Sequence, residues 1–166
     1  MIESIGDDME YKLESSSPKD VSILVDYKLR NIFDYASHLT EDEMSRIIDY
    51  VKKTVPKQLD NYKNITMGSR IIGCLLVLQE NDYYVLDEIY IEEQYRNQGI
   101  GTDIIKNVLK DHDYVKLCVY KKNRRAYALY ESLGFQIEYE KDERYHMVNK
   151  IEEKPKKKPK KAKKDK

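Results

Sequence analysis

A short glycine loop between a strand pattern and a helix pattern is the feature that most restricts how this chain can fold. The β-branched, apolar run that ends at Ile91 predicts a strand, and helical spacing of apolar residues begins near Ile100. Between them stands the sequence Arg96-Asn97-Gln98-Gly99-Ile100-Gly101. Two glycines let the main chain approach an anion closely, and the N–H groups at a helix start favour negative charge. The loop therefore predicts a site for a phosphate-bearing cofactor.

The loop by itself leaves a second interpretation open, because glycine before a helix also makes an ordinary tight turn. It is not a Walker loop, since no Gly-Lys-Ser or Gly-Lys-Thr follows it. The dinucleotide fingerprint would need a further glycine in place of Ile104 or a neighbour. Both nucleotide-binding classes are therefore disfavoured, and the rest of the chain must decide.

The length of the chain predicts a single domain. A chain of 166 residues can form one sizeable core but not two ordinary domains, so cofactor and substrate must share one fold, expected over residues 1–151. No run approaches the roughly 18 apolar residues of a membrane span. The start of the chain, with Asp7 and Asp8, lacks the basic and then apolar layout of a signal peptide. We expect a cytoplasmic protein that does not contact membranes.

Cysteine and histidine give no pattern of a metal site. Cys74 and Cys118 both lie in apolar runs that are typical of core strands, so we expect two buried, free thiols. The three histidines, His38, His112 and His146, are well separated, and no Cys or His pair has ligand spacing. We expect no metal and no Cys–His catalytic pair.

The formal charge of zero conceals an uneven distribution. Residues 154–166 contain nine lysines and one aspartate, so this segment carries about +8 and the rest of the chain about −8. Such a segment has nothing to bury in a core, and we expect a Lys-rich disordered tail over residues 152–166. The acidic body favours a cationic substrate through long-range attraction. Nucleic acid is not expected as a partner except through the tail.

The spacing of apolar residues predicts the order of helices and strands. Ser17 and Pro18 indicate the start of one helix, and Thr40 the start of a second helix that Pro56 kinks or ends. From residue 63 the pattern changes to an antiparallel meander of strands. The expected strands are 10–15, 64–67, 70–79, 83–91, 115–120, 135–139 and 145–149, and the later helices are 101–110 and 124–133. The predicted order is βααβββαβαββ.

Two separate motifs resemble the same family. They are Arg96-x-x-Gly99-x-Gly101 and Asn123-x-x-Ala126-x-x-x-Tyr130-Glu131-x-Leu133-Gly134-Phe135. With the order of elements, they make residues 9–150 similar to the GNAT superfamily of acetyl-CoA-dependent N-acetyltransferases. The resemblance implies an α/β (α+β) fold with a mixed, mainly antiparallel central sheet whose fourth and fifth strands splay apart. It also implies an acyltransferase that uses acetyl-CoA as co-substrate.

The resemblance further implies where acetyl-CoA binds. The pantetheine arm is expected in the gap between the splayed strands, against the main chain of the fourth strand, and the diphosphate on the glycine loop. Arg96 and the basic group Lys121, Lys122, Arg124 and Arg125 offer cations to the phosphates. Asn123 is expected either to cap the last helix or to bind the pantetheine arm. The implied cofactor-binding residues are Ile89, Tyr90, Ile91, Arg96, Asn97, Gln98, Gly99, Ile100, Gly101, Thr102, Asn123, Ala126 and Tyr130.

Three residues are implied as catalytic. Tyr130 matches the family's tyrosine near the coenzyme A sulfur, which donates a proton to the departing thiolate. Asp87 and Glu88 are the candidate bases for the amine, acting directly or through a water, with solvated or helix-capping carboxylates as the alternative. Strand alternation points the two to opposite sides unless a bulge intervenes, so at most one should face the cleft. Cys118 stands where some protein N-terminal acetyltransferases have a glutamate, which disfavours a ribosomal-protein substrate.

The expected substrate is a primary amine, with a small cationic amine favoured because the acidic pair resembles that of polyamine-type members. The alternatives are a protein or peptide N-acetyltransferase and a non-catalytic acyl-CoA-binding regulatory domain. Tyr130 favours an enzyme over the regulatory domain. The first two helices should form one side of the substrate cleft, with Phe33, Tyr35, His38 and Glu41 as candidate lining residues. A homodimer is the favoured assembly, because the final two strands often pair across dimers in this superfamily.

Overall fold

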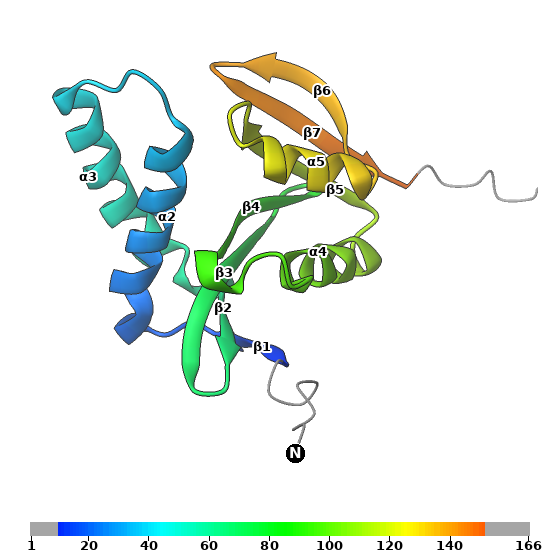
Figure 1. Ribbon diagram of the computed structural model, residues 1–166, viewed down its shortest axis with the longest axis horizontal. Helices are drawn as coiled ribbons and strands as arrows, with labels where there is room; N and C mark the ends of the chain where they lie inside the picture. The colour runs from blue at the N-terminus through cyan, green and yellow to red at the C-terminus, as the bar shows by residue number, and fades with distance from the viewer. Residues whose placement is uncertain (1–9, 152–166) are drawn as a thin grey trace, which may run out of the picture.

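The strands of residues 10–151, the part of the chain that the computed structural model describes, form one seven-stranded sheet in the order β1-β2-β3-β4-β5-β7-β6 (Figure 1). Each pair of neighbours is antiparallel except β4 and β5, which run parallel. The strands are β1 (Tyr11–Ser15), β2 (Tyr62–Met67), β3 (Arg70–Gln79), β4 (Tyr84–Ile91), β5 (Tyr114–Tyr120), β6 (Gln136–Lys141) and β7 (Arg144–Lys150). The mixed, mainly antiparallel sheet that the sequence predicted is confirmed.

The helices between these strands confirm the predicted order. They are α2 (Val21–Tyr35), α3 (Glu41–Lys57), α4 (Ile100–Asp111) and α5 (Arg124–Ser132). A 3₁₀ turn over Pro18–Asp20 precedes α2, so the regular helix begins later than Ser17. Thr40 caps α3 by accepting a hydrogen bond from the Glu43 N–H at 3.1 Å, and Pro56 lies in the last turn, where the helix ends.

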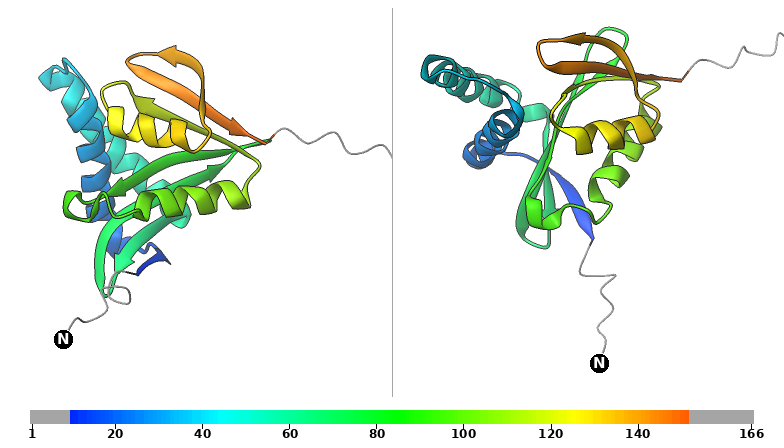
Figure 2. Two further views of the ribbon diagram at one scale, coloured as in Figure 1. Left: turned by 45° about the vertical axis from the view of Figure 1, so that its right-hand side comes forward. Right: turned by 45° about the horizontal axis from the view of Figure 1, so that its top comes forward.

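The helices cover the sheet in two layers. Helices α2 and α3 lie on one face, and α4 and α5 lie on the other (Figure 2). The α2–α3 layer buries Leu24, Tyr27, Val51 and Val55 against Tyr62, Cys74, Leu76 and Tyr90 of β2, β3 and β4. The α4–α5 layer buries a second core that includes Ile104, Ile105, Leu117, Phe135 and Met147. The sheet therefore separates two cores, and a gap in the sheet would connect them.

The prediction that both cysteines are buried is confirmed for Cys74 and wrong for Cys118. Cys74 is fully buried in the α2–α3 core, as expected, but Cys118 is exposed. In β5, Val115, Leu117 and Val119 point into the α4–α5 core, so the intervening Cys118 points to the opposite face. The buried side chains of α2 and α3 pack over β2, β3 and β4, and β5 contributes none to that core. The thiol is exposed because its face of β5 is not covered there.

Two further expectations concern what the chain lacks. Among residues 10–151, no helix is long and apolar enough to cross a membrane. The same residues contain no group of three or more His, Cys, Asp or Glu side chains that could hold a metal ion. The predicted tail, residues 152–166, and Asp7 and Asp8 lie outside the described residues. The domain boundary at residue 151 stays a prediction.

Candidate functional site

The glycine loop leaves an uncapped helix start. Asn97 and Gly99 both have left-handed backbone angles, with φ of 63° and 83°, and α4 begins at the next residue, Ile100. Unlike α3 and α5, α4 has no side-chain cap. Its first backbone hydrogen bond runs from the Asp103 N–H to the Gly99 carbonyl at 3.0 Å. The N–H groups between Gly99 and Asp103 therefore have no carbonyl of a preceding turn to bind, and they suit an anion.

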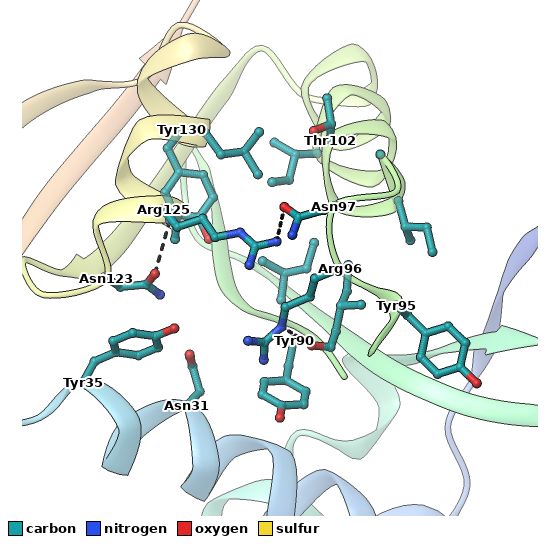
Figure 3. A pocket seen from close by; sticks show the side chains of 18 residues that line it. Asn31, Tyr35, Tyr90, Tyr95, Arg96, Asn97, Thr102, Asn123, Arg125 and Tyr130 are labelled. Carbon is teal, nitrogen blue, oxygen red and sulfur yellow. Dashed lines mark hydrogen bonds between the residues drawn. The ribbon is translucent and has the colours of Figure 1, made fainter. Parts of the chain in front are cut away.

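Two arginines adjoin this loop. Arg125, in the first turn of α5, donates a hydrogen bond from its guanidinium to Asn97 Oδ1 at 2.6 Å (Figure 3). Arg96 donates through Nε to the Ile91 carbonyl at 2.6 Å, and its guanidinium lies 5.3 Å from the Tyr90 ring centre. These bonds hold two positive charges beside the exposed N–H groups. The surroundings of the loop thus add to its attraction for phosphate.

Strands β4 and β5 separate shortly after they pair. Their ladder contains three residue pairs and ends at Leu86 and Leu117. The next residues, Asp87 on β4 and Cys118 on β5, stand where the gap opens. Beyond them, β4 still pairs with β3 as far as Ile91, but has no strand on its other side. The predicted splay of the fourth and fifth strands is confirmed.

A cavity of about 330 Å³ extends from the glycine loop into this gap. Figure 3 shows residues of α2 on one side of it and residues of α4 and α5 on the other. The residues that line it are Asn31, Tyr35, Ile89, Tyr90, Ile91, Tyr95, Arg96, Asn97, Gly99, Ile100, Gly101, Thr102, Ile105, Asn123, Arg125, Ala126, Leu129 and Tyr130. The cavity therefore joins an anion site to an opening between the two helical layers.

A β-bulge places both candidate bases on the α2 side of the sheet. Leu76 of β3 pairs with Glu88, whereas its neighbour Val77 pairs with Leu86, so Asp87 is the extra residue. Lys28 of α2 reaches both carboxylates, with Nζ 3.1 Å from Asp87 Oδ2 and 3.8 Å from Glu88 Oε2. The bulge is the exception that the sequence analysis allowed for, and it puts the two carboxylates on the same side instead of on opposite sides. Neither carboxylate lines the main cavity.

The two carboxylates have different surroundings. The Glu88 side chain is 2% exposed and accepts a hydrogen bond from the Tyr62 hydroxyl at 2.6 Å. Burial raises the pKa of Glu88, although Lys28 and the hydrogen bonds from Tyr62 and Cys74 oppose the shift. The Asp87 side chain is 33% exposed and stands at the opening of the gap. Of the pair, Asp87 is the one that a molecule in the gap can reach.

The exposed Cys118 is not isolated from basic groups. Its Sγ lies 3.8 Å from Nε2 of His146, the residue that pairs with it across β7. Partial burial of the sulfur raises the pKa of the thiol, and the nearby Arg144 guanidinium lowers it in part. The structure therefore places a histidine beside a cysteine, although no Cys or His pair has ligand spacing in the sequence. The pairing of β5 with β7, which the sequence does not specify, produces this contact.

Comparisons with known proteins agree on one family. Residues 62–137 match the family model described as an acetyltransferase (GNAT) domain. In fold, the chain is similar to the PaiA N-acetyltransferase of Thermoplasma acidophilum in complex with coenzyme A, with a TM-score of 0.71 at 17% identity over 86% of this chain and 99% of that one. Residues 62–137 are thus similar in sequence to the GNAT acetyltransferase domain, and the chain has the fold of GNAT N-acetyltransferases.

Two other comparisons bear on the site. A GNAT family acetyltransferase from Elizabethkingia anophelis with acetyl-CoA bound has a TM-score of 0.51 at 17% identity, over 60% of this chain and 83% of that one. Thialysine N-epsilon-acetyltransferases of Bos taurus and Mus musculus are 43% and 45% identical over 56 residues, which is 31% of this chain. The chain spans about a third of the length of these curated relatives.

The structure brings together nearly all the cofactor residues that the GNAT resemblance implied. The exception is Gln98, whose side chain donates to the Gln94 carbonyl at 3.3 Å and faces a separate hollow beside Tyr11 and Asp103. Asn123 caps α5, because its Oδ1 accepts a hydrogen bond from the Ala126 N–H at 3.2 Å. The same residue also borders the cavity, so a contact with the pantetheine arm is compatible with the cap. Their roles in binding stay predictions.

Several residues that line the cavity lay outside the predicted cofactor set. Asn31, Tyr35, Tyr95, Ile105, Arg125 and Leu129 border the cavity. Tyr35 had been predicted for the substrate cleft, but Phe33, His38 and Glu41 do not border the cavity. Arg125 belonged to the basic group with a suggested phosphate role. Asn31 lies one helical turn before Tyr35 on α2, so the sequence spacing alone places the two residues on the same face of the helix.

Tyr130 combines burial with access to the cavity. It lies on α5, is 9% exposed, and packs edge to face on Phe135 with ring centres 5.8 Å apart. Desolvation raises the pKa of its hydroxyl to about 12. The hydroxyl therefore keeps its proton at neutral pH. A protonated phenol that borders the cavity has the protonation state required of a general acid.

Proposed function

We propose that this protein transfers the acetyl group of acetyl-CoA to a primary amine. The observation that carries the proposal is the cavity that begins at the uncapped start of α4 and continues into the gap between β4 and β5. An anion site and an opening between strands suit a ligand with a diphosphate at one part and an extended arm at another. The fold-related proteins from Thermoplasma acidophilum and Elizabethkingia anophelis, which contain coenzyme A and acetyl-CoA, support this choice.

In this proposal the diphosphate binds the N–H groups of Ile100, Gly101 and Thr102. Arg125, already beside the loop through Asn97, supplies a positive charge for the phosphates. The pantetheine arm lies along the edge of β4 that β5 leaves after Leu86, where Ile89 and Ile91 line the cavity with their side chains. Gln98 is left out, because its side chain lies on the other side of the loop.

The chemistry is direct attack of the neutral amine on the thioester carbonyl. The amine nitrogen forms a bond to the acetyl carbon, the carbon–sulfur bond breaks, and the products are an acetylated amine and coenzyme A. Asp87, alone or through a water, accepts the proton that the amine loses, because it is the exposed member of the carboxylate pair. Tyr130 donates its proton to the departing sulfur. Glu88 supports the bulge rather than the proton transfer, since it is enclosed by Tyr62 and Lys28.

The substrate in this proposal is a small cationic amine. The body of the protein carries about eight excess negative charges, which attract a cation over a distance. The name of the mammalian relatives, thialysine N-epsilon-acetyltransferase, also refers to a small primary amine. A small substrate suits an opening that is bordered by Asn31 and Tyr35 of α2 and by residues of α5.

Thiol release from acetyl-CoA tests the proposal. The protein is given acetyl-CoA with each member of a panel: diamines, aminoglycosides, free amino acids and a lysine-containing peptide. We expect at least one small amine to release coenzyme A well above the rate of hydrolysis without amine. Tight binding of acetyl-CoA without release by any amine would contradict the enzyme and favour a regulatory acyl-CoA-binding domain. Release only with the peptide would contradict the small substrate.

A further inference from the structure

The uncovered face of β5 and β7 forms a wall beside the gap. Cys118 and Tyr120 point away from the α4–α5 core, and they pair across the sheet with His146 and Arg144. Asp87, whose carboxylate contacts Lys28 of α2, stands on the same side at the opening of the gap.

The acidic pair does not present two free negative charges to that amine. The ammonium of Lys28 lies within 4 Å of both carboxylates and is itself only 15% exposed. Glu88 is buried behind it against Tyr62. A polycationic substrate would need two free carboxylates, but the ammonium of Lys28 already pairs with both members of this pair. Only Asp87, which is 33% exposed, is then open to a substrate ammonium.

Arg144 supplies a positive charge on the same wall. Its guanidinium donates to the Tyr120 hydroxyl at 2.9 Å and lies 4.6 Å from the centre of that ring. It makes no ion pair with a carboxylate of residues 10–151. Cys118 follows Leu117, where the ladder with β4 ends beside Asp87, and Tyr120, the partner of Arg144, lies two residues further on the same face of β5. An oriented guanidinium without a carboxylate partner is suited to bind one.

We propose that the amine substrate also carries a carboxylate, which Arg144 binds while the amine lies beside Asp87. The substrate class is therefore an amino acid with a primary amine, such as a diamino acid, and Arg144 is the residue that determines this specificity. Tyr120 orients the guanidinium, and Lys28 prevents the acidic pair from binding a second cation. This inference rests on the proposed function.

Lysine and cadaverine differ only in the carboxylate and therefore make a matched pair for the test. We expect kcat/KM for lysine to exceed that for cadaverine at least tenfold, although the acidic body would favour the more cationic cadaverine. Arg144→Gln should lower kcat/KM for lysine by about 10- to 100-fold and leave cadaverine nearly unchanged. Arg46→Gln, the same change at an exposed position of α3, should alter neither value. Ornithine and putrescine provide a second pair.

Equal use of lysine and cadaverine, or an equal loss for both in Arg144→Gln, would overturn the inference while leaving the acetyltransferase proposal intact. A calorimetric titration of the coenzyme A-loaded protein with the same two amines gives a readout that needs no turnover. Tighter binding of lysine than cadaverine, lost in Arg144→Gln, supports the carboxylate site. Equal affinities exclude it. Failure of the proposed function would instead be recognised by the absence of thiol release with every amine.

Discussion

Tyr130 is the residue on which the proposed chemistry depends most. Its hydroxyl borders the cavity, and desolvation raises its pKa to about 12, so it can donate a proton across the physiological range. Asp87 is the complementary acceptor, because the bulge in β4 turns it toward α2 and leaves it partly exposed. In the proposed reaction these two residues supply the general acid and the general base.

The substitution Tyr130→Phe should lower kcat at least about 100-fold, because the departing thiolate loses its proton donor. The affinity for acetyl-CoA should change little, since the ring and its packing on Phe135 remain. Thiol release and calorimetry measure the two effects separately. Tyr50→Phe, at an exposed position of α3, is the matched control and should leave both values unchanged. Normal turnover in Tyr130→Phe would remove the acid assignment.

A second prediction concerns the buried carboxylate of Asp20, which joins the start of α2 to β2. It is 6% exposed and accepts hydrogen bonds from the Ser17 N–H at 2.8 Å and from Asn64 Nδ2 at 3.0 Å. Burial acts to raise the pKa of Asp20, but these hydrogen bonds outweigh it, and the pKa is lowered overall. The stabilisation is present above the unfolded-state pKa of about 3.9 and is lost as the pH falls through the lower folded-state value.

Asp20→Asn should therefore reduce the free energy of unfolding by about 1–2 kcal/mol at pH 7, because the hydrogen bonds lose their charged acceptor. The difference from the wild-type protein should shrink at acidic pH, where Asp20 is itself protonated. Urea denaturation at both pH values measures this. Asp49→Asn, on the exposed side of α3, should stay within about 0.5 kcal/mol of the wild type. A difference for Asp20→Asn that did not depend on pH would contradict the interpretation.

At the scale of elements, the site is made by the two ends of β4. At its start, a three-pair ladder joins β4 to β5, and a bulge then turns Asp87 toward α2. At its end, the glycine loop carries the chain into α4 with two left-handed residues, Asn97 and Gly99. The first end opens the sheet, and the second supplies the anion site. The cavity occupies the space between them.

Gly99 provides a direct test of the loop. A Cβ at this position would meet no atom within 4 Å, but its φ of 83° is strained for any residue with a side chain. Gly99→Ala should lower the free energy of unfolding by about 1–2 kcal/mol. The backbone of the loop should relax away from the left-handed conformation, which moves the N–H groups and should weaken acetyl-CoA binding at least tenfold. Gly68→Ala, with φ of 61° and an equally open site in the β2–β3 turn, should cost similar stability without affecting binding. Equal binding losses for both would refute a specific role of the loop.

The sequence predicts the order of the elements because helical and strand periodicities report which faces are buried. It does not predict the bulge, since Leu86, Asp87 and Glu88 have the same pattern in a regular strand as in a bulged one. The contact of Lys28 with these carboxylates joins residues 59 positions apart, which no local pattern encodes. The sequence does contain a pattern that indicates the exposure of Cys118. Lys116 and Tyr120, two residues away on either side, share its face of β5 and are polar or amphipathic.

At the scale of the whole molecule, the sheet keeps two separate cores, and the cavity lies where they meet. Residues of α2 and of α5 both border it, although their buried side chains belong to different cores. The described residues thus contain both halves of the proposed site. The contacts on which the proposed site is argued all lie among residues 10–151.

Removal of residues 152–166 should therefore leave the fold and the cofactor site intact. We expect the midpoint of thermal unfolding to change by no more than about 2 °C and the Kd for acetyl-CoA by no more than about twofold, because the composition of so lysine-rich a segment offers almost no apolar side chains for a core. Thermal denaturation and calorimetry on the truncated and full chains make the comparison. A large loss of stability or affinity would show that the domain extends beyond residue 151.

The most direct test of the central claim is a crystal structure of the protein with acetyl-CoA. The account predicts that the diphosphate accepts hydrogen bonds from the N–H groups of Ile100, Gly101 and Thr102. It also predicts that the thioester lies between β4 and β5, within reach of the Tyr130 hydroxyl. A structure in which the diphosphate binds elsewhere, or in which the ligand leaves the gap between the two strands empty, would contradict it.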